Sequence, residues 1–246
     1  LSDINADEFS RRAKELRPDI PVVLLAYHHR DLEMMRKQYQ DAYDNIVIWN
    51  GDTKILLTII KLVEDQRNVE ADTALLGVRV IILVENSVRF YSSYLPLMYT
   101  EIMLQAAALL SESINYSTRL LRMRARPKIL LAENFEAALE LFRKYRPYLL
   151  GVISDIQFPK EGKSDSTAGI QLAKLIKTES SDLPVLLQSS DESMAQRASA
   201  RDADFLNKRS PKLLNRLSSF INRNFGFGDF VFRLPDGTEL DRARNF

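Results

Sequence analysis

Residues 149–159 read LLGVISDIQFP, and the fold follows most directly from this stretch. Its first residues form an apolar run of strand length, and near-continuous runs of this kind are typical of buried parallel strands. The run ends on one acid, Asp155, and Pro159 then turns the chain out of the strand. In open α/β sheets, ligands bind just beyond the carboxyl ends of the strands. The stretch therefore predicts a parallel strand that carries Asp155 to the place where a site would lie.

The composition indicates a globular protein without a strong electrostatic bias. Of the 246 residues, 46% are hydrophobic and 27% are charged, and the formal net charge is +1. This balance predicts no general attraction to nucleic acid or to anionic membranes, and no apolar run reaches the roughly 20 residues of a membrane-spanning helix. The sequence has no Cys, which excludes disulfides and thiolate metal sites and agrees with a reducing cytoplasm. Because the chain opens abruptly on Leu1, without Met, we expect a fragment of a longer protein.

Strands and helices alternate along most of the chain. Between the apolar runs lie stretches with helical periodicity, and this alternation predicts a parallel sheet with covering helices. Apolar runs of strand length in the larger part of the chain occur at 78–84, 129–132, 149–154, 184–188 and 205–207.

The segment between the first two of these strands is unusually long. Residues 87–126 contain no Gly and a single Pro, Pro96, and they predict one long helix or two helices in series, kinked or started at Pro96. Such a helix offers a surface for a homodimer. Its end is basic, which favours a solvated helix end over a phosphate or nucleic-acid patch. The basic residues are Arg119, Arg122, Arg124 and Arg126.

The beginning of the chain repeats part of this pattern. Residues 19–25 read DIPVVLL and residues 182–187 read DLPVLL, and each stretch precedes a helix, a short strand and another helix. In the first case the helix covers 31–43 and begins at Asp31. We interpret the first part of the chain as an incomplete copy of the larger unit, and chance similarity of two buried strands is the alternative. The predicted division is a partial unit at 1–68, a polar connector at 69–77, a complete unit at 78–225 and a tail with a small hairpin at 226–246.

Polar side chains follow the strands of the complete unit at the edge where their carboxyl ends meet. Glu85 and Asn86 follow the first strand, Asp155 ends the third, Ser189 the fourth and Lys208 the fifth. In this order, with a β-α unit between each, the chain resembles the response-regulator receiver family. The resemblance rests on the motifs IILVENS (81–87), ISDIQFP (153–159), LPVLLQSS (183–190) and DFLNK (204–208).

The resemblance covers 78–225 in full and 1–64 in part, and it implies a fold. That fold is α/β, a flavodoxin-like, doubly wound sheet of five parallel strands, here preceded by a partial second receiver-like unit. The first unit departs from the family, because Ala26 stands where the hydroxyl belongs and Trp49 where the lysine belongs. We therefore expect a tandem arrangement in which the first unit is degenerate and takes no phosphate.

The same resemblance implies a phosphoacceptor site in a two-component phosphorelay. Asp155 would accept a phosphoryl group as an acyl phosphate, from a histidine kinase or a phosphotransfer protein. Lys208 and Ser189 would contact the phosphoryl oxygens, and Phe205 would be the aromatic side chain that changes rotamer when the surface switches. A Mg²⁺ ion would offset the phosphoryl charge. Its ligands would be Glu85, Asn86, Asp155 and the backbone carbonyl of Gln157.

One departure inside the site weakens this expectation. Asn86 stands where the family has its second acid, and an amide oxygen coordinates without bringing charge. The prediction is therefore weak Mg²⁺ binding and slow or conditional phosphorylation. The alternative is a pseudo-receiver that serves as a phosphorylation-independent interaction or dimerisation module.

Two further patterns bear on the context of the chain. Residues 126–131 and 225–232 resemble, more loosely, the receiver regions in front of phosphoenolpyruvate-synthase-like multidomain proteins, which implies a regulatory module without its own catalytic domain. A nucleotide-binding enzyme is disfavoured, because Gly226-x-Gly228 lacks a third Gly and follows a helix. His28 and His29 would need carboxylates to complete a metal site, and a loop pair is the favoured interpretation.

Overall fold

The computed structural model describes residues 6–27, 43–111, 126–225, 229–233 and 239–244. The chain divides into two compact units. The first comprises 1–64 with 87–96, and the second comprises 65–86 with 97–246. The division runs through two long helices, α3 (Lys54–Leu76) and α4 (Val88–Ser111), so each unit holds part of both.

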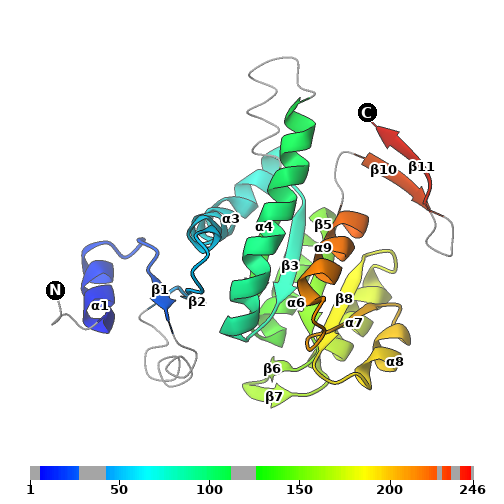
Figure 1. Ribbon diagram of the computed structural model, residues 1–246. Helices are drawn as coiled ribbons and strands as arrows, with labels where there is room; N and C mark the ends of the chain where they lie inside the picture. The colour runs from blue at the N-terminus through cyan, green and yellow to red at the C-terminus, as the bar shows by residue number, and fades with distance from the viewer. Residues whose placement is uncertain (1–5, 28–42, 112–125, 226–228, 234–238, 245–246) are drawn as a thin grey trace. The chain divides into compact units, whose positions relative to one another are not determined.

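A five-stranded sheet in the order β4-β3-β5-β8-β9 forms the centre of the second unit, and all of its neighbouring strands are parallel (Figure 1). β3 is the first of these five strands in the chain but lies second in the sheet, so the winding reverses between β3 and β5. This is the doubly wound, flavodoxin-like topology of receiver domains, and the predicted fold class is confirmed. The strands are β3 (Val80–Val84), β4 (Lys128–Ala132), β5 (Leu149–Asp155), β8 (Val185–Ser189) and β9 (Asp204–Asn207).

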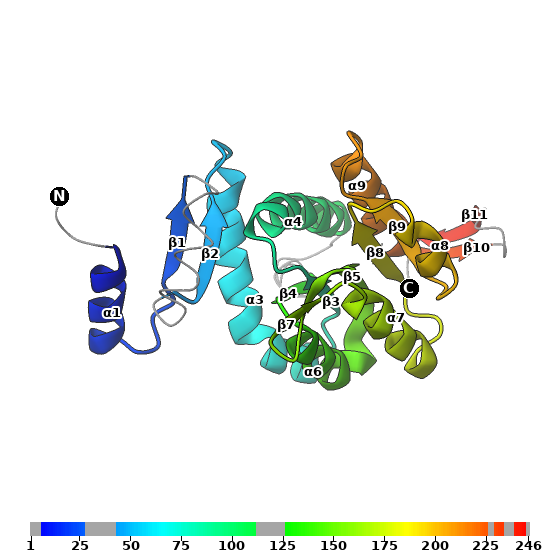
Figure 2. The ribbon, with the colours of Figure 1, turned by 90° about the horizontal axis from the view of Figure 1, so that it is seen from below.

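Helices cover both faces of this sheet (Figure 2). On one face lie α6 (Phe135–Tyr145) and α7 (Ala168–Glu179), whose apolar side chains join those of the strands in one buried core. On the other face lies α9 (Leu213–Asn224), and the residue after it, Phe225, packs against β5. A Cβ at Gly151 would lie 2.4 Å from the Phe225 ring, so only glycine allows this approach. Smaller elements are the 3-10 turn η1 (Arg146–Tyr148) and α8 (Met194–Ser199).

One local element differs from the sequence-based expectation. Helix α3 continues to Leu76, so most of the connector predicted at 69–77 is helical. After β5 the chain forms a small hairpin, β6 (Phe158–Lys160) with β7 (Lys163–Asp165). The last helix begins at Leu213. The domain boundaries themselves stay a prediction.

The first unit contains a two-stranded parallel sheet. It consists of β1 (Val23–Ala26) and β2 (Asn45–Ile48), and α1 (Ala6–Leu16) precedes them. The first turns of α4 belong to this unit, because the Tyr91 hydroxyl donates to the Ile46 carbonyl at 2.5 Å and the Ile48 N–H donates to Ser92 Oγ at 3.0 Å. The predicted helix at 31–43 and the His28–His29 pair lie outside the described residues.

The long segment at 87–126 and the tail at 226–246 form the elements predicted for them, as far as the structure describes these residues. Residues 88–111 form one continuous helix with Pro96 inside it, while three of the four basic residues, Arg119, Arg122 and Arg124, lie outside the described ranges. In the tail, β10 (Asp229–Arg233) and β11 (Glu239–Arg244) pair antiparallel, which confirms the hairpin. No helix among the described residues has the length and apolar character needed to span a bilayer.

Candidate functional site

Three charged side chains meet at the carboxyl ends of the central strands. The Lys208 ammonium lies 2.6 Å from Glu85 Oε2 and 2.8 Å from Asp155 Oδ2. Glu85 is 1% exposed and Lys208 4%, whereas Asp155 is 13% exposed and so faces solvent more than either partner. One cation therefore lies between two carboxylates, so the three side chains together carry one net negative charge. We call these three residues the Asp155 cluster.

The sheet topology explains why residues so distant in sequence converge. Glu85 directly follows β3 and Asp155 ends β5, and these two strands are neighbours at the point where the winding reverses. Lys208 follows β9, two strands away from β5, and its N–H continues the ladder by donating to the Ser189 carbonyl at 2.8 Å. Because the intervening strand is β8, the lysine side chain must extend across β8 to reach both carboxylates.

The backbone around Asp155 is held by close packing. The Ile156 N–H lies 2.8 Å from Asp155 Oδ1 and also donates to the Gln188 carbonyl at 2.9 Å. The Ile156 carbonyl accepts from the Gly169 N–H at 2.9 Å, which brings the start of α7 against the loop. A Cβ at Gly169 would lie 2.2 Å from the Asp155 carbonyl oxygen, so glycine is required there. Sequence reasoning missed Gly169, since a single glycine in a helical pattern gives no positional signal.

The two remaining residues with predicted signalling roles lie on the next two strands, Ser189 at the end of β8 and Phe205 near the start of β9. Ser189 is half-buried at the end of β8, and its Oγ accepts from the Asp191 N–H at 3.1 Å. The hydroxyl proton is not used in that bond and so stays available to another acceptor. Phe205, on β9, is half-buried against the core on the α6 and α7 face. Their roles stay predictions.

The loop after β8 is fixed by local hydrogen bonds. Asp191 Oδ1 accepts from the Ser193 N–H at 2.9 Å. Hydrogen bonds from the Ser193 side chain and backbone hold the pKa of Asp191 below its ordinary value, so the group keeps its charge. At the facing end of β9, the Asn207 amide donates to Glu192. These contacts tie the loop that follows Ser189 to the strand that precedes Lys208.

The predicted metal ligands are all oxygen donors, which suits a hard divalent cation. Glu85 and Asp155 are side by side, and their two carboxylates exceed the one ammonium in charge. Asn86 is half-buried in the loop after Glu85, and Gln157 is exposed beyond Asp155 with its amide 3.3 Å from Ser164 Oγ. Among the described residues, however, no three His, Cys, Asp or Glu side chains form a cluster able to hold a metal. The donors fit Mg²⁺ in kind but supply few charges.

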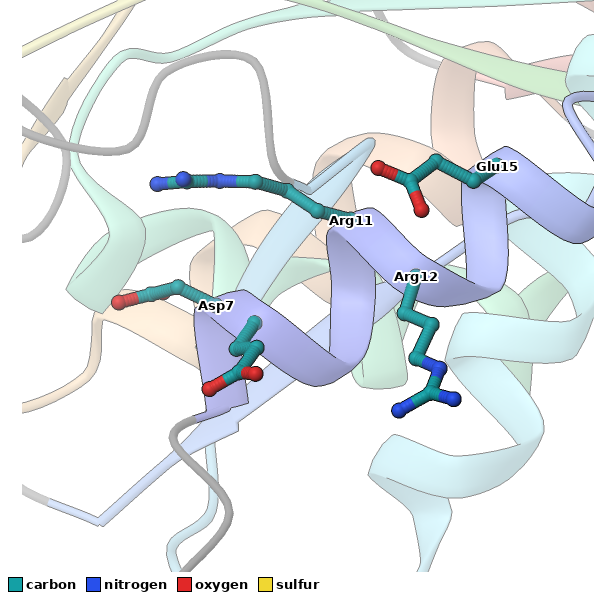
Figure 3. Close-up of a pocket in the computed structure, with 5 residues that line it drawn as sticks. Asp7, Arg11, Arg12 and Glu15 are labelled. Carbon is teal, nitrogen blue, oxygen red and sulfur yellow. The ribbon is translucent and has the colours of Figure 1, made fainter.

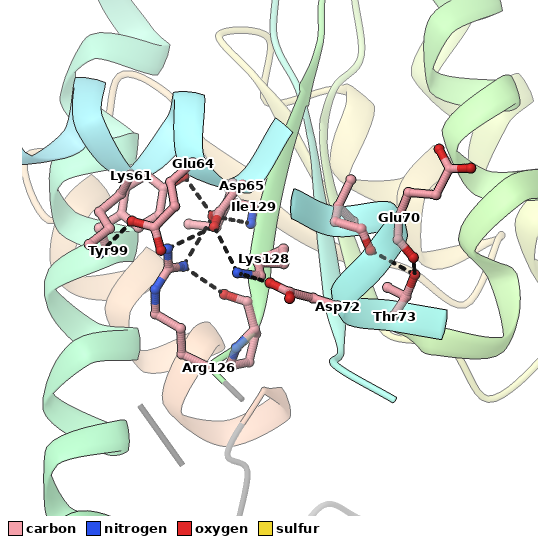
Figure 4. Close-up of polar contacts among 12 residues, drawn as sticks. Lys61, Glu64, Asp65, Glu70, Asp72, Thr73, Tyr99, Arg126, Lys128 and Ile129 are labelled. Carbon is pink, nitrogen blue, oxygen red and sulfur yellow. Dashed lines mark hydrogen bonds and ion pairs between the residues drawn. The ribbon is translucent and has the colours of Figure 1, made fainter. Parts of the chain in front are cut away.

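A second buried ion cluster lies at the opposite ends of the strands, and sequence reasoning missed it (Figure 4). Asp65, on α3, is fully buried and accepts from Arg126 Nη2 at 2.7 Å and Nη1 at 3.1 Å, from the Tyr99 hydroxyl at 2.9 Å and from the Ile129 N–H at 2.9 Å. We call the following five residues the Asp65 cluster: Asp65, Asp72, Tyr99, Arg126 and Lys128.

This second cluster corrects the interpretation of one basic residue. Arg126 was expected at a solvated helix end, but it is buried and paired with Asp65. Lys128 joins two of the acids of α3, at 2.7 Å from Asp72 Oδ2 and 3.7 Å from Asp65 Oδ1. A signal was present in the sequence, because Asp65 lies on the stripe of Leu62 and Val69 at helical spacing.

An open depression of about 450 Å³ lies along α1 in the first unit (Figure 3). Its lining among the described residues consists of charged side chains of that helix, and Arg11 and Arg12 point away from one another. This lining mixes both signs of charge, and no second described element contributes to it. It therefore contributes nothing to the site.

Comparison with known proteins yields solved structures only, since no protein-family model and no curated protein matches the chain. A response regulator receiver domain from Clostridium thermocellum shares 17% identity at a TM-score of 0.42, over 60% of this chain and 94% of that one. The phosphorylated cyanobacterial phytochrome response regulator RcpA shares 12% sequence identity at a TM-score of 0.40, over 67% of this chain and 99% of that one. The Mn²⁺-bound response regulator Rcp1 shares 17% sequence identity at a TM-score of 0.36, over 58% of this chain and 92% of that one. At these identities and TM-scores the likeness concerns the fold alone.

Proposed function

We propose that residues 78–225 form a response-regulator receiver module that accepts a phosphoryl group on Asp155 and thereby changes a surface recognised by a partner. The observation that carries the proposal is the position of the Lys208 ammonium, which extends across β8 to lie 2.8 Å from Asp155 and 2.6 Å from Glu85. A single cation between two carboxylates leaves a net negative site with one partly exposed nucleophile. The topology that assembles it is the one in which ligands bind beyond the strand ends.

The chemistry follows from the residues of the site. A carboxylate oxygen of Asp155 attacks the phosphorus of a phosphohistidine on a partner, and a P–O bond forms as the P–N bond breaks. The electron pair of the broken bond leaves with the imidazole nitrogen. The transferred group brings negative charge beside Glu85, so Lys208 moves its ammonium toward the phosphoryl oxygens as a point charge. The Ser189 hydroxyl proton is available to one of the same oxygens.

A divalent cation suits this arrangement. Glu85, Asn86, Asp155 and the Gln157 carbonyl would hold Mg²⁺, which supplies positive charge against the phosphoryl oxygens. Asn86 contributes an oxygen without charge, so we propose weak Mg²⁺ binding. The immediate phosphodonor would be a cytoplasmic histidine kinase or a phosphotransfer protein.

Intact-mass measurement tests the proposal. The full chain, incubated with phosphoramidate and Mg²⁺, should gain the mass of one phosphoryl group, and Asp155→Asn should gain none. Asp191→Asn is the matched control, because this acid lies in the loop beyond Ser189, where its Oδ1 accepts from the Ser193 N–H. A wild-type chain that stays unmodified, or an Asp155→Asn chain that is modified equally, overturns it.

A second candidate is a pseudo-receiver that acts by binding alone, without phosphate. The observation that favours it is the shortage of acids, since Asn86 replaces a carboxylate and no three-acid cluster is found among the described residues. Such a module would regulate a larger protein, for which a phosphoenolpyruvate-synthase-like context is our proposal from the sequence. Dimerisation through α4 is a weaker proposal, because its apolar side chains Tyr91, Met98 and Ile102 are buried.

For the first unit we propose a degenerate receiver-like module. Its two parallel strands support this, with Ala26 at the end of β1 and Trp49 directly after β2, where the hydroxyl and the lysine would stand. Neither side chain can contact a phosphoryl group as an ion or a hydroxyl. Phosphate found within 1–64 after the same incubation would contradict the proposal.

A further inference from the structure

Gln188 is a buried polar residue next to the site that no contact so far explains. It is 1% exposed on β8, and neither its side-chain oxygen nor its side-chain nitrogen has a hydrogen-bond partner within the described part of the chain. Its backbone carbonyl accepts from Ile156, so the lack concerns the amide group alone. Native proteins leave few buried polar groups unpaired, and each such group raises the free energy of the state in which it lacks a partner.

The register places this amide on the floor of the Asp155 cluster. Gln188 pairs directly with Asp155 on one side and with Leu206 on the other. Side chains at paired positions of parallel strands point to the same face, and alternation along β9 then puts Lys208 on that face as well. Because Lys208 extends from β9 to Asp155, its side chain crosses β8 on the face that carries Gln188.

The resting state therefore combines a closed ion pair with an unpaired amide beneath it. If Lys208 were drawn away from the Asp155 carboxylate, water or a phosphoryl oxygen would reach the amide and pair with it. The unpaired amide would then destabilise the closed state but not the open state.

We propose that Gln188 is a positioning residue that biases the Lys208–Asp155 ion pair toward opening. The consequence for phosphoryl uptake rests on the function proposed above, whereas the bias on Lys208 does not. An aliphatic residue at 188 would pack under the lysine without any unpaired group and would hold the pair closed.

Gln188→Met tests this, because methionine is unbranched and similar in length to glutamine but has no amide. The expected results are a higher melting temperature and a Lys208 that reacts roughly fivefold to tenfold more slowly with acetic anhydride, as peptide mass mapping would show, since one unpaired amide is worth about such a factor. Phosphoryl uptake from phosphoramidate should slow by a similar factor. Leu186→Met, a buried change on the same face and strand, should leave Lys208 reactivity unchanged.

Two results would overturn the proposal, and neither depends on whether Asp155 takes phosphate. A lower melting temperature in Gln188→Met, with faster Lys208 acetylation, would mean that the amide is paired and supports the closed state. A higher melting temperature with unaltered Lys208 acetylation would reduce Gln188 to a packing defect. If the wild-type chain takes no phosphate but Lys208 acetylation slows as expected, the receiver function fails and the positioning role stands.

Discussion

The two ion clusters at opposite ends of the central strands differ in net charge and in the burial of their central acids, Asp65 and Asp155. The Asp65 cluster pairs two acids with two bases, and Asp65 is fully buried among four donated hydrogen bonds (Figure 4). The Asp155 cluster pairs two acids with one base, and Asp155 is 13% exposed. Both clusters join α-helical or loop elements to the same sheet, but only the Asp155 cluster carries a net negative charge.

This difference separates a structural role from a chemical one. A charge-balanced cluster leaves no excess charge for a ligand, and the buried charge of Asp65 is tolerated because it is paired and hydrogen-bonded. It fixes the second half of α3 and the start of β4 in one arrangement. An excess of negative charge at a partly exposed edge instead attracts a cation, as the proposed receiver function requires.

Removal of one acid from each cluster should give the largest difference between the two clusters in the free energy of unfolding. Asp65→Asn leaves Arg126 buried opposite a neutral amide, and breaking a buried pair in this way costs about 3–5 kcal/mol of the free energy of unfolding. Asp155→Asn removes the excess charge and leaves Lys208 paired with Glu85, so we expect a change of no more than about 1 kcal/mol. Urea denaturation followed by circular dichroism measures both.

The comparison fails if the two variants lose similar stability. Equal losses would mean that the Asp155 cluster also serves mainly to hold the fold. A stable Asp65→Asn variant would instead mean that water reaches Arg126 and that the Asp65 cluster is not sealed.

The packing of α7 against the Asp155 loop offers a smaller effect that separates stability from chemistry. In Gly169→Ala the new methyl group meets the Asp155 carbonyl oxygen at 2.2 Å, and relieving this overlap costs about 1–3 kcal/mol and shifts the loop. Gly162→Ala, in the hairpin, meets no atom within 4 Å and only strains a backbone with φ of +73°, at about 1 kcal/mol. Thermal denaturation ranks the two variants.

Phosphoryl uptake then completes this test. We expect uptake to fall strongly in Gly169→Ala and to stay at the wild-type level in Gly162→Ala. Normal uptake in a destabilised Gly169→Ala chain would mean that the Asp155 loop tolerates displacement and that its close packing serves stability alone.

An exposed ion pair in the first unit provides a weak reference for the two buried clusters. Burial raises the pKa of Asp44, but hydrogen bonds from Lys14 Nζ and from the Val22 N–H outweigh it and hold the pKa below the ordinary 3.8. A carboxyl whose pKa is lower in the folded state stabilises that state above the ordinary value and loses this effect as the pH falls through the folded pKa. The carboxylate side chain is 40% exposed, so screening limits the effect to about 1 kcal/mol at most.

Melting curves of Asp44→Asn against wild type, recorded from pH 7 downward, measure this contribution. The difference in melting temperature should be constant near neutrality and should shrink below about pH 4, where the wild-type carboxylate becomes protonated. A difference that persists unchanged in strong acid would attribute the effect to packing and not to charge.

The sequence predicted the sheet and the Asp155 cluster for a common reason. Buried parallel strands are apolar throughout, so the first polar residue after each run is conspicuous, and Glu85, Asp155 and Lys208 were found in this way. Parallel topology then requires that these residues share one edge of the sheet. The structure places the Glu85 and Asp155 carboxylates within 2.8 Å of the Lys208 ammonium. Ser189 was placed by the same logic and Phe205 by the family resemblance, and no contact in the structure tests their roles.

The misses arise where polar residues are buried by tertiary contacts. Residues 69–77 looked like a connector because they are polar, yet Asp72 and Thr73 are paired within the fold and α3 continues to Leu76. Gln188 escaped notice because a single amide at the end of an apolar run resembles the solvated end of a strand. Local pattern does not reveal which polar residue has a buried partner, because that partner lies far away in sequence.

Chemical trapping of the modified residue tests the central claim most directly. Borohydride reduces an acyl phosphate on aspartate to the alcohol and leaves homoserine, which peptide mass mapping locates in the sequence. After incubation with phosphoramidate and Mg²⁺, the account predicts homoserine at position 155 and at no other position, with none in Asp155→Asn. Homoserine at any other carboxylate, or none in a wild-type chain treated beside a receiver domain that does label, would contradict it.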